Sequence, residues 1–167
     1  MHEPVCMTGK VADPMEILAQ LEALVQPSGP TMLYRISSLA NAAALLGRYL
    51  ERVNWVGFYL VDEQLRQLVL GPFWGAPACT VIPFGKGVCG TAWSGRETMT
   101  VPDVHAFAGH IACDAASRSE VVVPLVSGGT VVGVLDVDSP ILDRFAPYDV
   151  HFLEKAAEIV SRVLPFT

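Results

Sequence analysis

The chain has 167 residues, a hydrophobic content of 51% and a formal net charge of −6 at pH 7. This length predicts one domain with a core large enough to fold without disulfide cross-links. The negative charge argues against a nucleic-acid partner, and no apolar run is long enough to cross a bilayer, so we expect no membrane association either.

The first third of the chain predicts helices. Residues 1–13 are expected to form an irregular tail, and residues 14–167 a single domain. Pro14 suits the first turn of a helix, which the Pro-Ser-Gly-Pro run at residues 27–30 ends. Thr31 can cap a second helix. Apolar spacing predicts that helix's buried stripe at Leu33, Ile36, Ala40, Ala43, Leu46 and Leu50.

From residue 54 onward, short segments rich in β-branched and aromatic residues predict strands. The expected strands are residues 54–61, 65–73, 79–83, 99–101, 121–126 and 131–137. A glycine loop at residues 84–87 precedes a short helix over residues 88–94, and Pro147 opens a closing helix. The last two strands flank a Ser-Gly-Gly-Thr turn and form a hairpin. This order predicts an α+β domain, in which helices pack on the faces of a central antiparallel β-sheet.

Residues 101–120, VPDVHAFAGHIACDAASRSE, show neither strand alternation nor a sustained helical stripe. Long irregular segments inside a compact domain tend to be functional. We interpret this one as the wall or lid of an active site, with Cys113 as its reactive residue. His110 lies three residues before Cys113, and a neighbouring histidine can favour the nucleophilic thiolate. The alternative is that Cys113 is a small buried apolar residue.

The chain has four cysteines, Cys6, Cys79, Cys89 and Cys113, and none forms a Cys-x-x-Cys pair. Residues 1–10 lack the features of a signal peptide, so we expect a cytoplasmic location, where cycling disulfides are usually catalytic or sensory. Cys89 is flanked by glycines at an expected helix start. Free N–H groups there can bind a carboxylate or lower the pKa of a thiol, although a packed cysteine in a tight turn fits equally well. Cys79 lies in an expected strand, where a cysteine is usually a packed core residue. It becomes a candidate site residue only if the irregular segment brings Cys113 into contact with it.

Three carboxylates, Glu120, Asp136 and Asp138, lie at the ends of the apolar hairpin strands. Such residues are usually solvated, but a cluster can bind an ammonium group or supply a proton. Trp55 and Tyr59 are four residues apart in a strand and share a face, which fits either core packing or an aromatic pocket wall. His105, His110 and Cys113 match no standard zinc site, so we expect no metal and no cofactor.

Several of these segments together resemble the free methionine-(R)-sulfoxide reductases, small enzymes with a GAF fold. The resemblance rests on residues 54–59 (NWVGFY), 70–73 (LGPF), 78–80 (ACT), 82–91 (IPFGKGVCGT), 101–120 and 133–139 (GVLDVDS). It extends from about Asn54 to the closing helix, with no departure at these motifs. It does not cover the tail that contains Cys6.

The resemblance implies an enzyme that reduces free L-methionine-(R)-sulfoxide and is recycled by thioredoxin. Cys113 then matches the attacking nucleophile, Cys79 its disulfide-forming partner, and Cys89 a third cysteine whose catalytic, resolving or positioning role stays open. The matching substrate-binding or proton-donating residues are Trp55, Tyr59, Glu120, Asp136 and Asp138, together with the backbone at Val88 and Cys89. Homodimers are common among similar GAF folds. A small-molecule sensor without turnover, and a thiol redox sensor without a specific substrate, are the alternatives.

Overall fold

The structure is a computed structural model that describes residues 13–25, 31–111 and 113–164. The expected tail before Asp13, Cys6 within it, and the Pro-Ser-Gly-Pro run lie outside the described residues. No helix among the described residues is long and apolar enough to cross a membrane.

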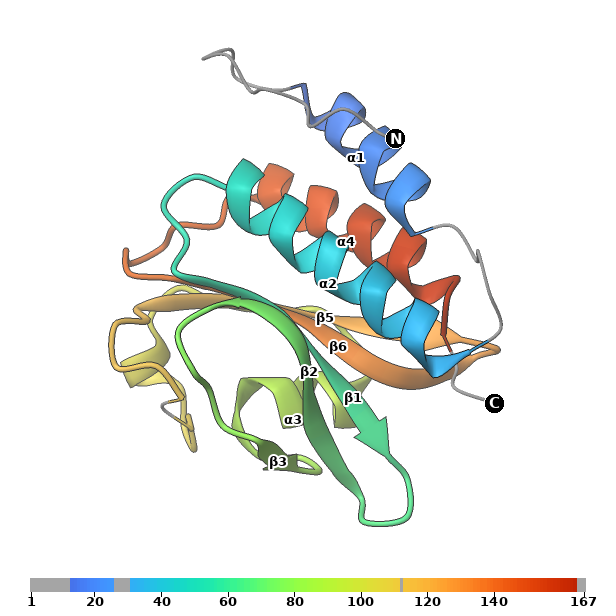
Figure 1. Ribbon diagram of the computed structural model, residues 1–167. Coiled ribbons are helices and arrows are strands. Elements are labelled where there is room, and N and C mark those ends of the chain that lie inside the picture. Colours follow the sequence, from blue (N-terminus) through green and yellow to red (C-terminus); the bar gives the residue numbers. More distant parts are fainter. Residues whose placement is uncertain (1–12, 26–30, 112, 165–167) are drawn as a thin grey trace.

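One antiparallel sheet divides the helices into two layers (Figure 1). The helices are α1 (Pro14–Leu24), α2 (Met32–Tyr49), α3 (Gly87–Gly95) and α4 (Pro147–Ser161), with a 3-10 turn η1 (Val104–Ala106). The strands are β1 (Trp55–Asp62), β2 (Gln67–Gly75), β3 (Val81–Pro83), β4 (Met99–Val101), β5 (Ser119–Ser127) and β6 (Thr130–Ser139). Their order in the six-stranded sheet is β3-β2-β1-β6-β5-β4. The expected α+β class is therefore confirmed.

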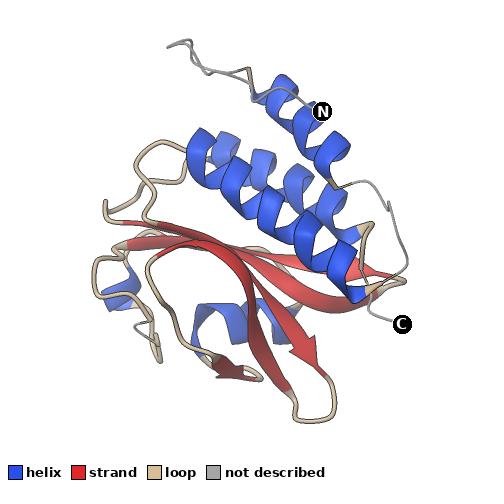
Figure 2. Ribbon diagram, viewed as in Figure 1, coloured by secondary structure: helices blue, strands red, loops and turns tan. Residues whose placement is uncertain are grey.

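The two faces of the sheet bury different cores because side chains alternate along each strand. Val56 and Phe58 of β1 point to the face covered by α2 and α4, on which α1 packs in turn (Figure 2). Trp55 and Tyr59 point to the opposite face, which α3 covers. Burying both faces places β1 and the β5–β6 hairpin at the centre of the molecule, and any polar side chain on these strands must find a partner there.

The buried stripe of α2 differs from the expected one. Leu33 and Ile36 are 74% and 41% exposed, and Ala40 is also exposed. Ala43, Leu46 and Leu50 are buried as expected, and the other buried residues of the helix are Ser38, Leu39, Ala42 and Gly47. At Gly47 a Cβ atom would come within 2.5 Å of the Trp74 ring, so the close approach of α2 to β2 needs glycine there and turns the apolar start of the helix outward.

Candidate active site

The hairpin strands bring three carboxyl groups together on the α3 face of the sheet. Glu120 of β5 lies opposite Asp138 of β6, and Asp136 follows two residues away on the same face. The alternate residues, such as Val121 and Val137, point into the other core. Only 5% of Glu120 and 6% of Asp136 is exposed. Strand alternation thus turns three scattered acidic residues into one buried cluster.

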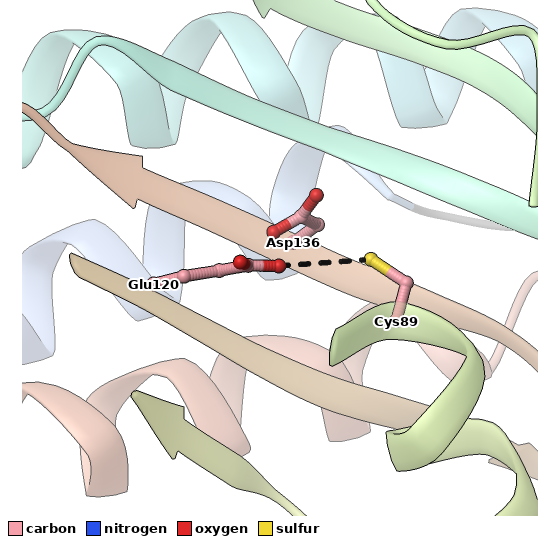
Figure 3. A group of neighbouring side chains, drawn as sticks. All are labelled: Cys89, Glu120 and Asp136. Atoms are coloured by element: carbon pink, nitrogen blue, oxygen red, sulfur yellow. Dashed lines mark hydrogen bonds between the residues drawn. The ribbon is translucent and has the colours of Figure 1, made fainter. Parts of the chain in front are cut away.

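Helix α3 adds a thiol to this cluster. Cys89 is buried in the first turn of α3, and its Sγ atom lies 4.0 Å from Oε1 of Glu120. Figure 3 shows Cys89, Glu120 and Asp136, from α3, β5 and β6, pointing toward one another. Gly87 has φ +62°, which favours glycine, and it starts the helix at the pocket. The N–H groups of this first turn have no partner inside the helix, so they are suited to an anion.

Cys79 and Cys113 form a disulfide bond, with their Cα atoms 5.2 Å apart. The pairing that the resemblance implied is therefore present, and Cys89 is free. Cys79 lies in the loop before β3 rather than in the strand that we expected, because pairing with β2 begins at Val81. Both bonded cysteines are half-buried, so an external thiol can approach this disulfide more easily than it can approach Cys89.

The aromatic residues of β1 hold the loop that contains Cys79. The Trp55 and Tyr59 rings stack with their centroids 5.9 Å apart. The Trp55 indole N–H donates to the Ala76 carbonyl at 3.0 Å, and the Tyr59 hydroxyl donates to the Cys79 carbonyl at 3.0 Å. Both side chains are fully buried beside the site. They share a face as expected, and their hydrogen bonds hold the backbone of the loop at Ala76 and Cys79.

The segment that contains Cys113 is held by residues that we did not predict as site residues. The Asn54 side-chain amide donates to Oδ2 of Asp114 at 2.8 Å and to the Ser117 hydroxyl at 3.2 Å. The Arg118 N–H donates to the Ser139 carbonyl at 2.7 Å. Asn54 directly precedes β1. Its position as a polar residue at the start of a buried strand is the one sequence signal that could have predicted this role.

Helix α3, strands β3, β5 and β6 and the irregular segment line a pocket of about 30 Å³. Its lining is formed by Ile82, Gly87, Val88, Cys89, His110, Ile111, Cys113, Asp114, Ser117, Glu120, Asp136 and Asp138. This confirms that the irregular segment is a wall of the pocket. Trp55 and Tyr59 lie outside this lining, so the aromatic wall is not part of the pocket in the disulfide form. Such a volume holds no more than about two water molecules.

Burial controls the charge of the cluster. It raises the pKa of Glu120 well above its usual range, and Asp136 and Asp138 raise that pKa further. Burial also raises the pKa of Asp136 to about 7, although hydrogen bonds with Cys89 and Glu120 act in the opposite direction. The pKa of Asp138 is raised as well, by burial and then by Asp136. The cluster therefore keeps protons at neutral pH and can act as an acid.

Burial also shifts Cys89 and His110, which line the pocket, toward their neutral forms. Burial raises the pKa of the Cys89 thiol, and the carboxyl groups of Asp136 and Glu120 raise it further. Of the two alternatives that the sequence left open for Cys89, this favours a packed cysteine over a thiol with a lowered pKa, because burial beside carboxyl groups outweighs the helix dipole. Burial lowers the pKa of His110, whose Nε2 atom lies 3.8 Å from Oε2 of Glu120. A neutral thiol and a neutral imidazole thus face the acidic cluster.

Fold and site together define a GAF domain that has a disulfide bond at its pocket. The GAF domain family profile matches residues 31–164. The free methionine-R-sulfoxide reductase of Escherichia coli is 48% identical over 132 residues, which cover 79% of each chain. The enzyme of that name from Saccharomyces cerevisiae is 41% identical over 157 residues, covering 90% of this chain and 87% of the yeast protein.

The structural comparison agrees with these relatives. The X-ray structure of free methionine-R-sulfoxide reductase from Neisseria meningitidis, in complex with its substrate, has a TM-score of 0.85 and 45% sequence identity. It covers 97% of this chain and 95% of that chain. The chain belongs to the free methionine-R-sulfoxide reductases of the GAF domain family.

Proposed function

We propose that this protein reduces free L-methionine-(R)-sulfoxide to L-methionine. The observation that supports this most directly is the Cys79–Cys113 disulfide bond beside a pocket lined by two buried carboxyl groups, Glu120 and Asp136, and the half-buried Asp138. A sulfoxide needs a soft nucleophile for its sulfur and a proton for its oxygen, and this site offers both. The relatives named above are reductases of this substrate, and one of them is known with it bound.

The chemistry uses the Cys113 and Cys79 thiols once each and leaves Cys89 unchanged. The Cys113 thiolate attacks the sulfoxide sulfur, while a protonated carboxyl group of Glu120, Asp136 or Asp138 gives a proton to the oxygen. Methionine leaves, and Cys113 takes the oxygen as sulfenic acid. The Cys79 thiol condenses with it, which forms the disulfide and releases water. Exchange with an external dithiol returns both thiols, and we expect thioredoxin to be that dithiol.

The pocket also explains why the substrate should be the free amino acid. The ammonium group needs an anion, which a carboxyl group of the cluster that has lost its proton supplies, as Asp136 can with a pKa of about 7. The substrate's carboxylate group needs hydrogen-bond donors. The free N–H groups at Val88 and Cys89 are such donors. A methionine sulfoxide residue within a protein lacks both charged groups. We therefore expect an N-acetylated, amidated substrate to be turned over poorly.

The quaternary structure and location stay predictions. An exposed apolar face at the start of α2, which includes Leu33 and Ile36, is suited to a second copy of the chain. We propose a homodimer on this basis. Because a thioredoxin-recycled enzyme needs a reducing compartment, we also propose that the protein is cytoplasmic.

The test is steady-state turnover with a thioredoxin recycling system. We expect methionine from the R epimer of the free sulfoxide and none from the S epimer, and we expect Cys113→Ser to lower the rate by at least about a thousandfold. Binding of the sulfoxide without turnover would support a sensor instead. Oxidation of the cysteine pair by peroxide, with no preference for the sulfoxide, would support a thiol redox sensor.

A further inference from the structure

The three side chains drawn in Figure 3 form a mixed sulfur and oxygen donor set that the proposed reaction does not fully use. One donor atom each from Cys89, Glu120 and Asp136 lies within 4.8 Å of the other two. All three residues are buried, and they come from three separate elements, so packing rather than a flexible loop holds them in place. The set is therefore preorganised toward one point.

A second observation points to a missing ligand. The Oδ1 atom of Asp136 is buried and has no hydrogen-bond partner among the described residues. Asp136 also lines the pocket. Buried polar atoms are nearly always paired, and an exception calls for a water, an ion or a ligand group.

We propose that Cys89, Glu120 and Asp136 bind Zn²⁺, or a similarly soft divalent cation, as an inhibitor of the enzyme rather than as a cofactor. A thiolate with carboxylate oxygens suits Zn²⁺, whereas Mg²⁺ requires oxygen ligands in octahedral geometry. Binding releases the thiol proton, and any proton that the two carboxyl groups hold, to solvent and forms the sulfur–metal and oxygen–metal bonds. The pocket side of the ion stays open to a fourth ligand, and His110 is nearby there, since its Nε2 atom lies 3.8 Å from Oε2 of Glu120.

Inhibition follows from the position of the cluster. In the proposed function, these carboxyl groups bind the substrate's ammonium group and protonate its sulfoxide oxygen. The metal ion and the sulfoxide therefore compete for them. This part rests on the proposed function, but binding of the ion does not. The two parts can therefore fail separately.

Binding is tested on the oxidised protein, in which Cys79 and Cys113 are already bonded to each other. A Cys6→Ser background leaves Cys89 as the one free thiol of the 167-residue sequence. Zn²⁺ is titrated against a chromophoric chelator, and Co²⁺ is used to look for a thiolate-to-metal absorption band. We expect one equivalent to bind, and Cys89→Ser and Asp136→Asn each to raise the Zn²⁺ dissociation constant at least about tenfold.

The control variant is His105→Asn, because His105 is exposed on the same segment and lies outside the pocket lining. It should bind Zn²⁺ like the parent protein, and thermal unfolding of each variant shows that it is folded. Equal Zn²⁺ affinity in folded Cys89→Ser would overturn the proposal, as would a parent protein with no thiolate–Co²⁺ band. In the turnover assay, Zn²⁺ should compete with the sulfoxide in the parent, and Cys89→Ser should need at least about tenfold more Zn²⁺ for the same relative inhibition.

Discussion

Cys79 and Cys89 lie in different surroundings, from which we predict different roles for them. Cys79 is half-buried and bonded to Cys113, while Cys89 is a buried neutral thiol beside Glu120. A resolving cysteine must reach both the sulfenic acid and the external reductant. The geometry favours Cys79 for that step and leaves Cys89 to the carboxyl cluster.

This difference predicts opposite outcomes for two conservative variants. Pre-reduced Cys79→Ser should still release methionine in one turnover, because Cys113 is intact, but it should keep a sulfenic acid that a dimedone probe labels. Cys89→Ser should form the Cys79–Cys113 disulfide. Peptide mass spectrometry after one turnover distinguishes the two variants. A Cys89–Cys113 bond in the parent enzyme would contradict the assignment.

Asp136 predicts a pH dependence of stability. Its pKa is raised from 3.8 in the reference state to about 7 in the fold, so the folded state holds a proton that the unfolded chain releases. Its contribution to the free energy of unfolding therefore falls as pH rises from about 4 to 7. Asp136→Asn has no charge to bury, so its stability relative to the parent should increase from pH 5 to pH 8.

Denaturant unfolding at pH 5 and pH 8 measures this difference. The same substitution at exposed Asp143 serves as the control and should leave the pH dependence unchanged. A stability difference between Asp136→Asn and the parent that is the same at both pH values would contradict the burial of a protonated Asp136.

At the scale of elements, the irregular segment between β4 and β5 closes the pocket. The pocket encloses only about 30 Å³ in the disulfide form, which is too small for methionine sulfoxide. Reduction removes the Cys79–Cys113 cross-link and leaves the segment held by Asn54, by a few backbone hydrogen bonds and by the packing of Val104, Phe107 and Ile111. We therefore expect the segment to open on reduction.

Hydrogen exchange of the oxidised and reduced protein tests this. Amides at residues 104–111 and 113–118 should exchange faster after reduction, whereas those of α4 should be unchanged. Equal protection of the segment in the two forms would mean that the substrate enters by another route.

The elements that could be predicted from the sequence are those with local signals. The β5–β6 hairpin follows from its turn and its two runs of β-branched residues, and α4 from its proline start and helical spacing. The rotation of α2 could not be predicted, because it depends on contact between Gly47 and Trp74. The contact between Cys89 and Glu120 could not be predicted either, because it depends on how α3 packs against strands that lie far from it in the sequence.

For the whole molecule, the disulfide bond links residues that are 34 positions apart. Closing a loop of this length in the unfolded chain stabilises the fold by up to about 4 kcal/mol in the chain-entropy account. The oxidised protein should therefore resist urea better than the reduced protein. Cys79→Ser should abolish the difference, and Cys89→Ser should retain it. A reduced form of equal stability would contradict this prediction.

The exposed start of α2 predicts an assembly in solution. Leu33→Asp combined with Ile36→Asp should convert a dimer into a monomer, because two charges would then lie in an apolar interface. Leu65→Asp, at a residue 67% exposed in the β1–β2 turn, is the matched control. Light scattering after size exclusion measures the mass. A parent protein that is monomeric at micromolar concentration would refute the homodimer.

The central claim is that Cys113 reduces the free sulfoxide and then pairs with Cys79. The most direct measurement is a single turnover of the fully reduced protein with free L-methionine-(R)-sulfoxide and no added reductant. We predict one equivalent of methionine per chain and one equivalent of the Cys79–Cys113 disulfide, formed together. No methionine, or disulfide formation without it, would contradict the account.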